Sequence, residues 1–241
     1  MKKQMTDSAL WRNKIESMIN RGTNVQEDTY VMVTHKEFIQ LDHTKSTGKE
    51  SCINSFVKSI NRVVKASACD SSAFGYSIHM NNGDSIIILS DGTLKKYNKK
   101  NKLMSSKVGS TNDGHLRTTL TYPRQTTVLL ERLMYIAHCV YNDSLPSSFD
   151  GVTCNVMDTS GNTENCFGAK YNLDPSNLEF CNGDKNTTAY YTTKKLYNMT
   201  GKLYRISAYD AVLEDAVRCR PVSDVLWYIN KVGIEEVNTN K

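Results

Sequence analysis

The sequence lacks several features that mark familiar classes of protein. It has no run of about 18 apolar residues, so we expect no membrane-spanning helix and no membrane partner. Two lysines stand near the N-terminus in MKKQMTDSALWRNK, but no apolar stretch follows them, so we expect no secretory signal peptide. There is no internal repeat and no low-complexity segment. These absences favour an ordinary globular protein located in the cytoplasm.

Cysteine is present, but without a spacing that indicates pairs or metal ligands. The chain has seven cysteines, an odd number, and no C-x-x-C pair. In a reducing cytoplasm such cysteines are mostly small buried hydrophobic side chains. A zinc site built from Cys154, Cys166 and Cys181 is the alternative, although a spacing this wide is only a weak signal for zinc.

The composition is typical of a soluble globular chain. Hydrophobic residues make up 39% and charged residues 23% of the 241 residues, enough for one large or two small domains with a buried core. The net charge of +5 is modest. Where the positive charge is concentrated therefore matters more than its total.

Hydrophobic periodicity predicts helices near both ends of the chain. Residues 7–20 carry an apolar stripe at helical spacing after Asp7, a possible N-cap, and residues 52–65 carry a second stripe. Residues 207–233 favour two packed helices separated at Pro221. Each stripe is typical of a helix face that packs into a core.

The middle of the chain is rich in short β-prone runs. GYSIHM, DSIIILS, TLKKY and HLRTTLTY are broken by NNG, SDG and NDG turns, which predicts a small antiparallel sheet. Residues 126–142 then pass from strand to helix. One connection, residues 95–107, carries six lysines and no acidic residue. It is either a solvated hairpin tip or a finger that contacts phosphate groups.

Two later segments, CNVMDTSGN (154–162) and NLEFCNGDKNTT (177–188), resemble the motifs of phage-type HNH homing endonucleases. The resemblance covers about residues 85–195. It includes LLERLMYIAHCVYN as the linking helix, with Glu131 where the family has a histidine. It implies a ββα-metal unit. The residues themselves predict a short helix over 184–195 with Asp184 as its N-cap and two lysines in its last turn.

The resemblance also implies a role for individual residues. Asn177 falls on the position that braces the loop, Asn186 and Asn155 fall on metal-binding positions, and Val156 falls on the general base. Valine cannot accept a proton, and the loss of a positioned base costs roughly 10²–10⁴-fold in rate. Asp158 is the alternative metal ligand or weak base, and His138 on the linking helix is a further alternative.

The resemblance therefore predicts a pseudo-nuclease with no cofactor or with weakly bound Mg²⁺ or Mn²⁺. A phage-encoded protein of this kind would act in the host cytoplasm on nucleic acid, with DNA favoured over RNA, or on a host nucleoprotein complex as an anti-defence inhibitor. The alternatives are an active metal-dependent endonuclease and a purely protein-binding module. The candidate nucleic-acid contacts are Lys95, Lys96, Lys99, Lys100, Lys102, Lys107, Arg117, Arg124, Arg132, Lys194 and Lys195.

Together these patterns predict an α+β fold. It would comprise an N-terminal helical region, a small antiparallel β module, an HNH-like ββα unit and C-terminal helices. The corresponding boundaries are residues 1–72, 73–128, 129–200 and 201–241.

Overall fold

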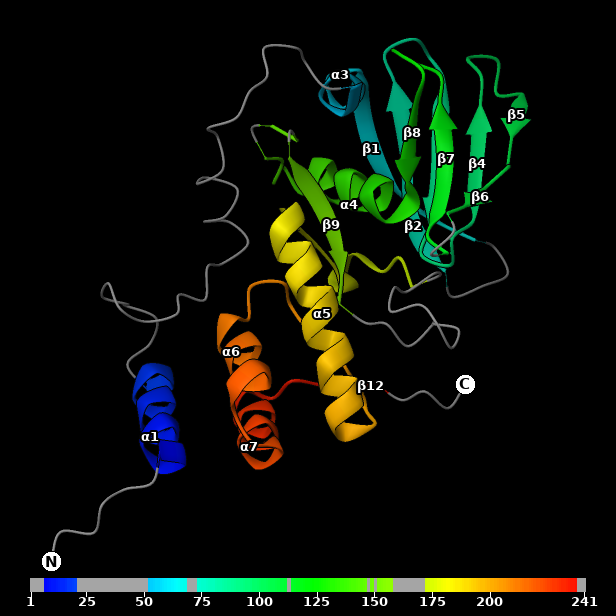
Figure 1. Ribbon diagram of the computed structural model, residues 1–241. Helices are drawn as coiled ribbons and strands as arrows, with labels where there is room; N and C mark the ends of the chain where they lie inside the picture. The colour runs from blue at the N-terminus through cyan, green and yellow to red at the C-terminus, as the bar shows by residue number, and fades with distance from the viewer. Residues whose placement is uncertain are drawn as a thin grey trace, which may run out of the picture.

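The computed structural model describes residues 7–20, 52–68, 73–111, 114–146, 148–149, 151–157 and 172–237. Within these ranges the protein is built from small antiparallel sheets and six helices (Figure 1), which confirms the mixed α and β class. None of the helices in these ranges is long and apolar enough to cross a membrane.

A five-stranded antiparallel sheet dominates the first half of the described chain, and its strands follow one another in sequence order. Glycines with positive φ, Gly83 and Gly92, close the two tight turns at the NNG and SDG sequences, as expected. The strands are β1 (Ile60–Ser67), β2 (Phe74–Met80), β3 (Ser85–Leu89), β4 (Leu94–Tyr97) and β5 (Leu103–Ser105).

The helix predicted over residues 52–65 is wrong in its second half. Helix α3 spans only Cys52–Lys58, and the chain continues directly into β1. Consecutive β-branched residues, Val63 and Val64, fit a pleated strand when a partner strand is available. That partner is β2, which pairs with β1 along its whole length. The β1–β2 pairing therefore joins residues on the two sides of the predicted domain boundary between residues 72 and 73.

A second, three-stranded sheet leads into the central helix. Its strands are β6 (Gly109–Ser110), β7 (Leu116–Leu120) and β8 (Thr126–Leu129), and α4 (Leu130–Tyr141) follows at once. This confirms the predicted passage from strand to helix. Leu133, Met134 and Ile136 are completely buried, since α4 packs against strands of both sheets and against the β9–β10 pair described next. Helix α4 is therefore the centre of the larger hydrophobic core.

The last third of the chain begins with an antiparallel strand pair and ends in helices. The predicted pair of C-terminal helices is confirmed, with Pro221 at the N-cap of the second. The elements are β9 (Val152–Val156), the 3₁₀ turn η1 (Pro175–Asn177), β10 (Leu178–Asn182), α5 (Gly183–Thr200), β11 (Leu203–Tyr204), α6 (Ala211–Cys219), α7 (Val222–Val232) and β12 (Glu236–Val237).

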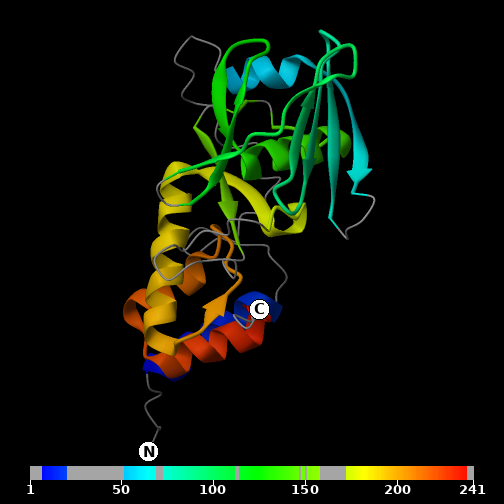
Figure 2. The ribbon, with the colours of Figure 1, turned by 90° about the vertical axis from the view of Figure 1, so that its right-hand side faces the viewer.

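The N-terminal helix α1 (Asp7–Asn20) packs against the C-terminal helices and completes a second, smaller core. Trp11 and Ile15 are its buried residues. The buried carboxylate of Asp224 on α7 accepts hydrogen bonds from Ser8 and, at 2.8 Å, from Arg12 Nη2. Figures 1 and 2 show α1, α6 and α7 together in the lower part of the molecule.

Candidate functional site

In the described chain, β9 is followed by the turn η1, then by β10 and helix α5. The two strands pair in antiparallel register from Val152↔Asn182 to Val156↔Leu178. The Asn182 side chain accepts a hydrogen bond from the Lys185 backbone N–H at 2.8 Å and caps α5. The predicted cap, Asp184, is wrong, because it lies inside the first turn of the helix. Helix α5 also runs further in both directions than the predicted residues 184–195.

Asn155 lies in a buried hydrogen-bond network. Its Nδ2 donates to Glu179 Oε1, directly across the strand pair, at 2.7 Å. The Glu179 carboxylate also accepts from the Ala208 backbone N–H at 2.6 Å and from Ser207 Oγ at 2.9 Å. Burial raises the pKa of Glu179, although these three hydrogen bonds oppose the shift. Asn155 therefore holds a buried carboxylate and joins β9 to the segment before α6.

Two other residues of the motif also serve the packing of the strand pair. Val156, which the resemblance places at the general-base position, is half-buried and packs against the larger core. Asn177 is buried, and its Nδ2 donates to the Asn172 carbonyl at 3.2 Å. The Asn177 carbonyl accepts from the Met157 backbone N–H at 3.0 Å, which extends the pairing beyond β9. Asn177 thus links the strands to the preceding loop.

The described residues contain only part of the metal site that the resemblance implies. No group of three or more His, Cys, Asp or Glu side chains suited to a metal ion occurs in the described ranges. Asn186 is half-buried, and its Oδ1 is 3.9 Å from the Cys181 thiol. Asn155 is buried, and its Nδ2 donates to Glu179. Asp158, the alternative ligand, and Cys166, one of the three cysteines of the alternative zinc site, lie outside the described residues.

His138, the alternative base, lies in an aromatic cluster at the C-terminal end of α4. Its Nδ1 is 2.8 Å from the Tyr76 hydroxyl, and the Tyr135 ring stacks on the imidazole at 5.7 Å between centroids. Burial lowers the pKa of His138, while the charge of Asp174 acts in the opposite direction. These contacts give His138 a structural role, as a packed and hydrogen-bonded side chain at the edge of the core.

The outer face of the five-stranded sheet, the side turned away from α4, is the most distinctive exposed surface. The strand register places Arg62, His79, Ser85, Tyr97 and Leu103 in one cross-strand row. A second row holds Val64, Ser77, Ile87 and Lys95. In Figure 2 this face is at the right-hand edge, and no described helix or strand covers it.

The strands of this sheet carry positive charge only. Their sequences contain Arg62, Lys65, Lys95 and Lys96 and no Asp or Glu. Arg62 and Lys95 lie on the outer face, whereas Lys65 and Lys96 lie on the side that faces α4. The β4–β5 turn adds the exposed Lys99, Lys100 and Lys102. Two acidic residues lie in the neighbouring turns and keep their negative charge: Asp84 accepts from the Lys99 backbone N–H at 3.1 Å, and Asp91 accepts from the Thr93 N–H at 2.8 Å. The exposed cations of the face and the β4–β5 turn outnumber them. The result is a basic outer face with a lysine-rich edge.

Of the basic residues predicted to contact nucleic acid, two are hydrogen-bonded within the protein and the others are exposed. Lys96 points to the inner side, where its Nζ donates to the Thr119 carbonyl at 2.6 Å and burial lowers its pKa. Arg132 donates to the Phe149 carbonyl at 3.0 Å. Both side chains therefore serve the packing. The exposed members are Lys95, Lys99, Lys100, Lys102, Lys107, Arg117, Arg124, Lys194 and Lys195.

Sequence patterns missed Arg62, His79 and Tyr97 as members of this surface. Arg62 was hidden by the wrong helix assignment, and His79 and Tyr97 fall on the outer side only once the register is known. The alternation in GYSIHM, with buried Tyr76, Ile78 and Met80, was the available signal for His79.

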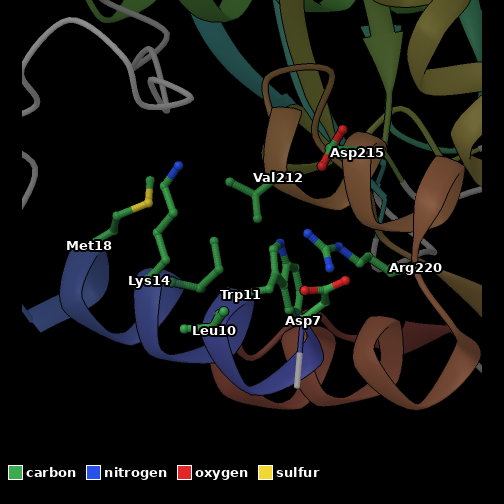
Figure 3. Close-up of a pocket in the computed structure, with 9 residues that line it drawn as sticks. Asp7, Leu10, Trp11, Lys14, Met18, Val212, Asp215 and Arg220 are labelled. Carbon is green, nitrogen blue, oxygen red and sulfur yellow. The ribbon is translucent and has the colours of Figure 1, made fainter. Parts of the chain in front are cut away.

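A groove of about 420 Å³ lies between α1 and α6. Figure 3 shows Trp11, Lys14 and Met18 of α1 facing Val212 and Asp215 of α6, with Arg220 beside them. The Arg220 guanidinium lies 5.4 Å from the Trp11 ring centroid. The groove carries charges of both signs and no cluster of catalytic groups.

Comparison of the chain with protein-family models, with curated proteins and with solved structures found no significant match. The assignment of a function therefore depends on the chemistry of the surfaces described above.

Proposed function

We propose that this protein binds nucleic acid through phosphate contacts on the outer face and lysine-rich edge of the five-stranded sheet. The observation that carries the proposal is the absence of acidic residues from all five strands, together with exposed Arg62, Lys95, Lys99, Lys100 and Lys102. A surface of one sign attracts a polyanion, and each phosphate contact releases condensed counterions.

The other side chains of the face suit the same partner. Tyr97 offers an aromatic ring and a hydroxyl, and Ser77 and Ser85 offer hydroxyl groups that can donate to phosphate oxygens. His79 lies in the same row as Arg62, and burial followed by the Arg62 charge lowers its pKa. A bound phosphate would oppose this lowering and would favour the protonated imidazole.

We further propose that the chain is an HNH-like protein that does not cleave its partner. Val156 supplies no proton acceptor, and Asn155 is buried beneath the surface, with its Nδ2 donating to Glu179 at 2.7 Å. Cleavage by the HNH mechanism requires both a positioned base and an accessible metal ligand. Phosphate binding requires neither, so a binding function is compatible with this arrangement.

Binding is tested by fluorescence anisotropy with a labelled 20-base-pair DNA duplex at 50 and 200 mM salt. We expect the affinity to fall steeply with salt, and we expect Lys95→Gln/Lys99→Gln/Lys100→Gln to weaken binding at least about tenfold. If all three lysines contact phosphates, the slope of log affinity against log salt falls by about 3. The matched control, Lys14→Gln/Lys202→Gln/Lys231→Gln, makes the same charge change on the α1–α7 side.

Equal losses in the two triple variants would refute a site on the sheet, because they would reflect net charge alone. Binding that does not depend on salt would refute phosphate contact. Absence of cleavage is tested separately by incubating supercoiled plasmid with the protein and Mg²⁺ or Mn²⁺. Metal-dependent nicking that Asn186→Ala abolishes would favour the active-endonuclease alternative.

A further inference from the structure

Helix α5 presents an exposed side that combines tyrosine rings with lysines. Tyr190, Tyr191 and Tyr197 have exposed fractions of 39%, 57% and 40%, although large aromatic side chains are usually well buried. Lys194 and Lys195 are exposed on the same side. The opposite side of the helix, with Ala189, Thr192, Thr193 and Leu196, is buried.

The spacing places these side chains in two adjoining stripes. Tyr190, Lys194 and Tyr197 follow the i, i+4, i+7 pattern of one helix face, and Tyr191 with Lys195 forms the neighbouring stripe. The Tyr190 and Tyr191 rings meet edge to face, with centroids 5.4 Å apart. From Tyr190 to Tyr197 the helix rises about 10 Å, which is the length of about three stacked nucleotides at ~3.4 Å each.

The charge of this surface indicates the chemistry of its partner. Asp184 is the one acidic residue of α5, and it lies in the first turn, at least a full turn before the tyrosines. Lys194 and Lys195 stand among the rings, so the complementary partner is anionic and offers flat apolar faces. Unpaired nucleobases on a phosphate backbone meet both requirements, whereas a duplex keeps its base faces stacked inside.

We infer that the exposed side of α5 binds single-stranded nucleic acid, with bases stacking on Tyr191 and its neighbouring rings and phosphates contacting Lys194 and Lys195. This inference deepens the proposed nucleic-acid-binding function and rests on it. It adds a second surface, because α5 lies away from the five-stranded sheet (Figure 2). The protein would then hold a duplex and an adjoining single strand at different places.

The test compares a labelled dT20 oligonucleotide with the 20-base-pair duplex, for the wild-type protein, Tyr191→Ala, Tyr191→Phe and Lys194→Gln/Lys195→Gln. Base stacking is worth about 1–3 kcal/mol per base, so we expect Tyr191→Ala to weaken dT20 binding by about 5- to 150-fold. Duplex affinity should stay within about twofold. Tyr191→Phe keeps the ring and should keep the dT20 affinity, and a thermal melt checks that each variant is folded.

Wild-type dT20 affinity in Tyr191→Ala would overturn the inference, and so would an equal loss of duplex binding. If the wild-type protein binds the duplex but not dT20, the α5 inference fails while the proposed sheet function stands. If it binds dT20 through Tyr191 but does not bind the duplex, the sheet proposal fails instead. Polyglutamate that binds more tightly than dT20 and depends on Tyr191 would assign this surface to an acidic protein, which also overturns the inference.

Discussion

Replacement of Asn155 by alanine separates a structural role for this residue from a metal-binding one. The substitution removes the 2.7 Å hydrogen bond to the buried Glu179 carboxylate and the longer one, 3.4 Å, to the Ile206 carbonyl. A hydrogen bond to a charged group contributes about 1.5–3 kcal/mol, so we expect the free energy of unfolding to fall by about 2–3 kcal/mol. For a domain of this size that corresponds to a melting temperature lower by about 5–10 °C.

The same network predicts a pH dependence. Because the folded pKa of Glu179 is raised, the folded state binds more protons than the unfolded state at pH values between the ordinary glutamate value and the folded one. Stability should therefore fall as pH rises through that window. Glu179→Gln removes the titration and can still accept from Asn155 and Ala208, so its stability should vary less with pH there. Urea unfolding followed by circular dichroism at several pH values measures this difference.

The control is Asn198→Ala, at an exposed position on α5, where a change within about 0.5 kcal/mol is expected. A double-mutant cycle with Asn155→Ala and Glu179→Ala, each of which removes the hydrogen bond, should give a coupling energy of at least about 0.5 kcal/mol, because the two side chains are in direct contact. An Asn155→Ala variant as stable as the wild-type protein would refute the structural role and would return Asn155 to the list of possible metal ligands.

Three further predictions concern stability. Asp224→Ala removes the acceptor of Ser8 and Arg12 and should destabilise the packing of α1 by about 1.5–2 kcal/mol. This is the lower part of the range for hydrogen bonds to charged groups, because the Arg12 side chain is 36% exposed; tryptophan fluorescence should shift to the red. The pKa of Asp224 is lowered, since hydrogen bonds from Ser8 and Arg12 outweigh the opposing effect of burial, so the wild-type contact should weaken as pH falls below the ordinary aspartate value. Gly75→Ala would place a Cβ 2.0 Å from the Ile88 carbonyl oxygen and should cost about 3 kcal/mol in urea unfolding, whereas Gly183→Ala meets nothing within 4 Å and should cost almost nothing. Leu133→Ala, at a fully buried position of α4, should lower the free energy of unfolding by about 2–5 kcal/mol, and a loss under 1 kcal/mol would contradict the central place of this helix.

Local sequence patterns determined most of the regular elements. The strands β2 to β4 follow from β-prone runs between glycine-containing turns, and the two C-terminal helices follow from apolar stripes separated by Pro221. The helix α4 was predictable because its apolar run is long and has no breaker. Such patterns act within a few residues and need no distant partner.

Other features were decided by contacts between residues far apart in the chain. Residues 60–65 have an apolar pattern that also suits a helix, and pairing with β2 made them a strand. From the sequence, Lys96 is as likely to be exposed as its neighbour Lys95. The strand register places it on the inner side, where it donates to the Thr119 carbonyl. Asn155 matched a metal-binding position, and the buried Glu179 opposite it gave it a different partner.

The sequence by itself thus determined where chain segments become helices and strands, and where positive charge is concentrated. The tertiary structure decided which side of each strand faces solvent and which polar group each buried side chain meets. The physical reason is that strand register and burial depend on the partner segment, and a shift of one residue exchanges the two faces of a strand.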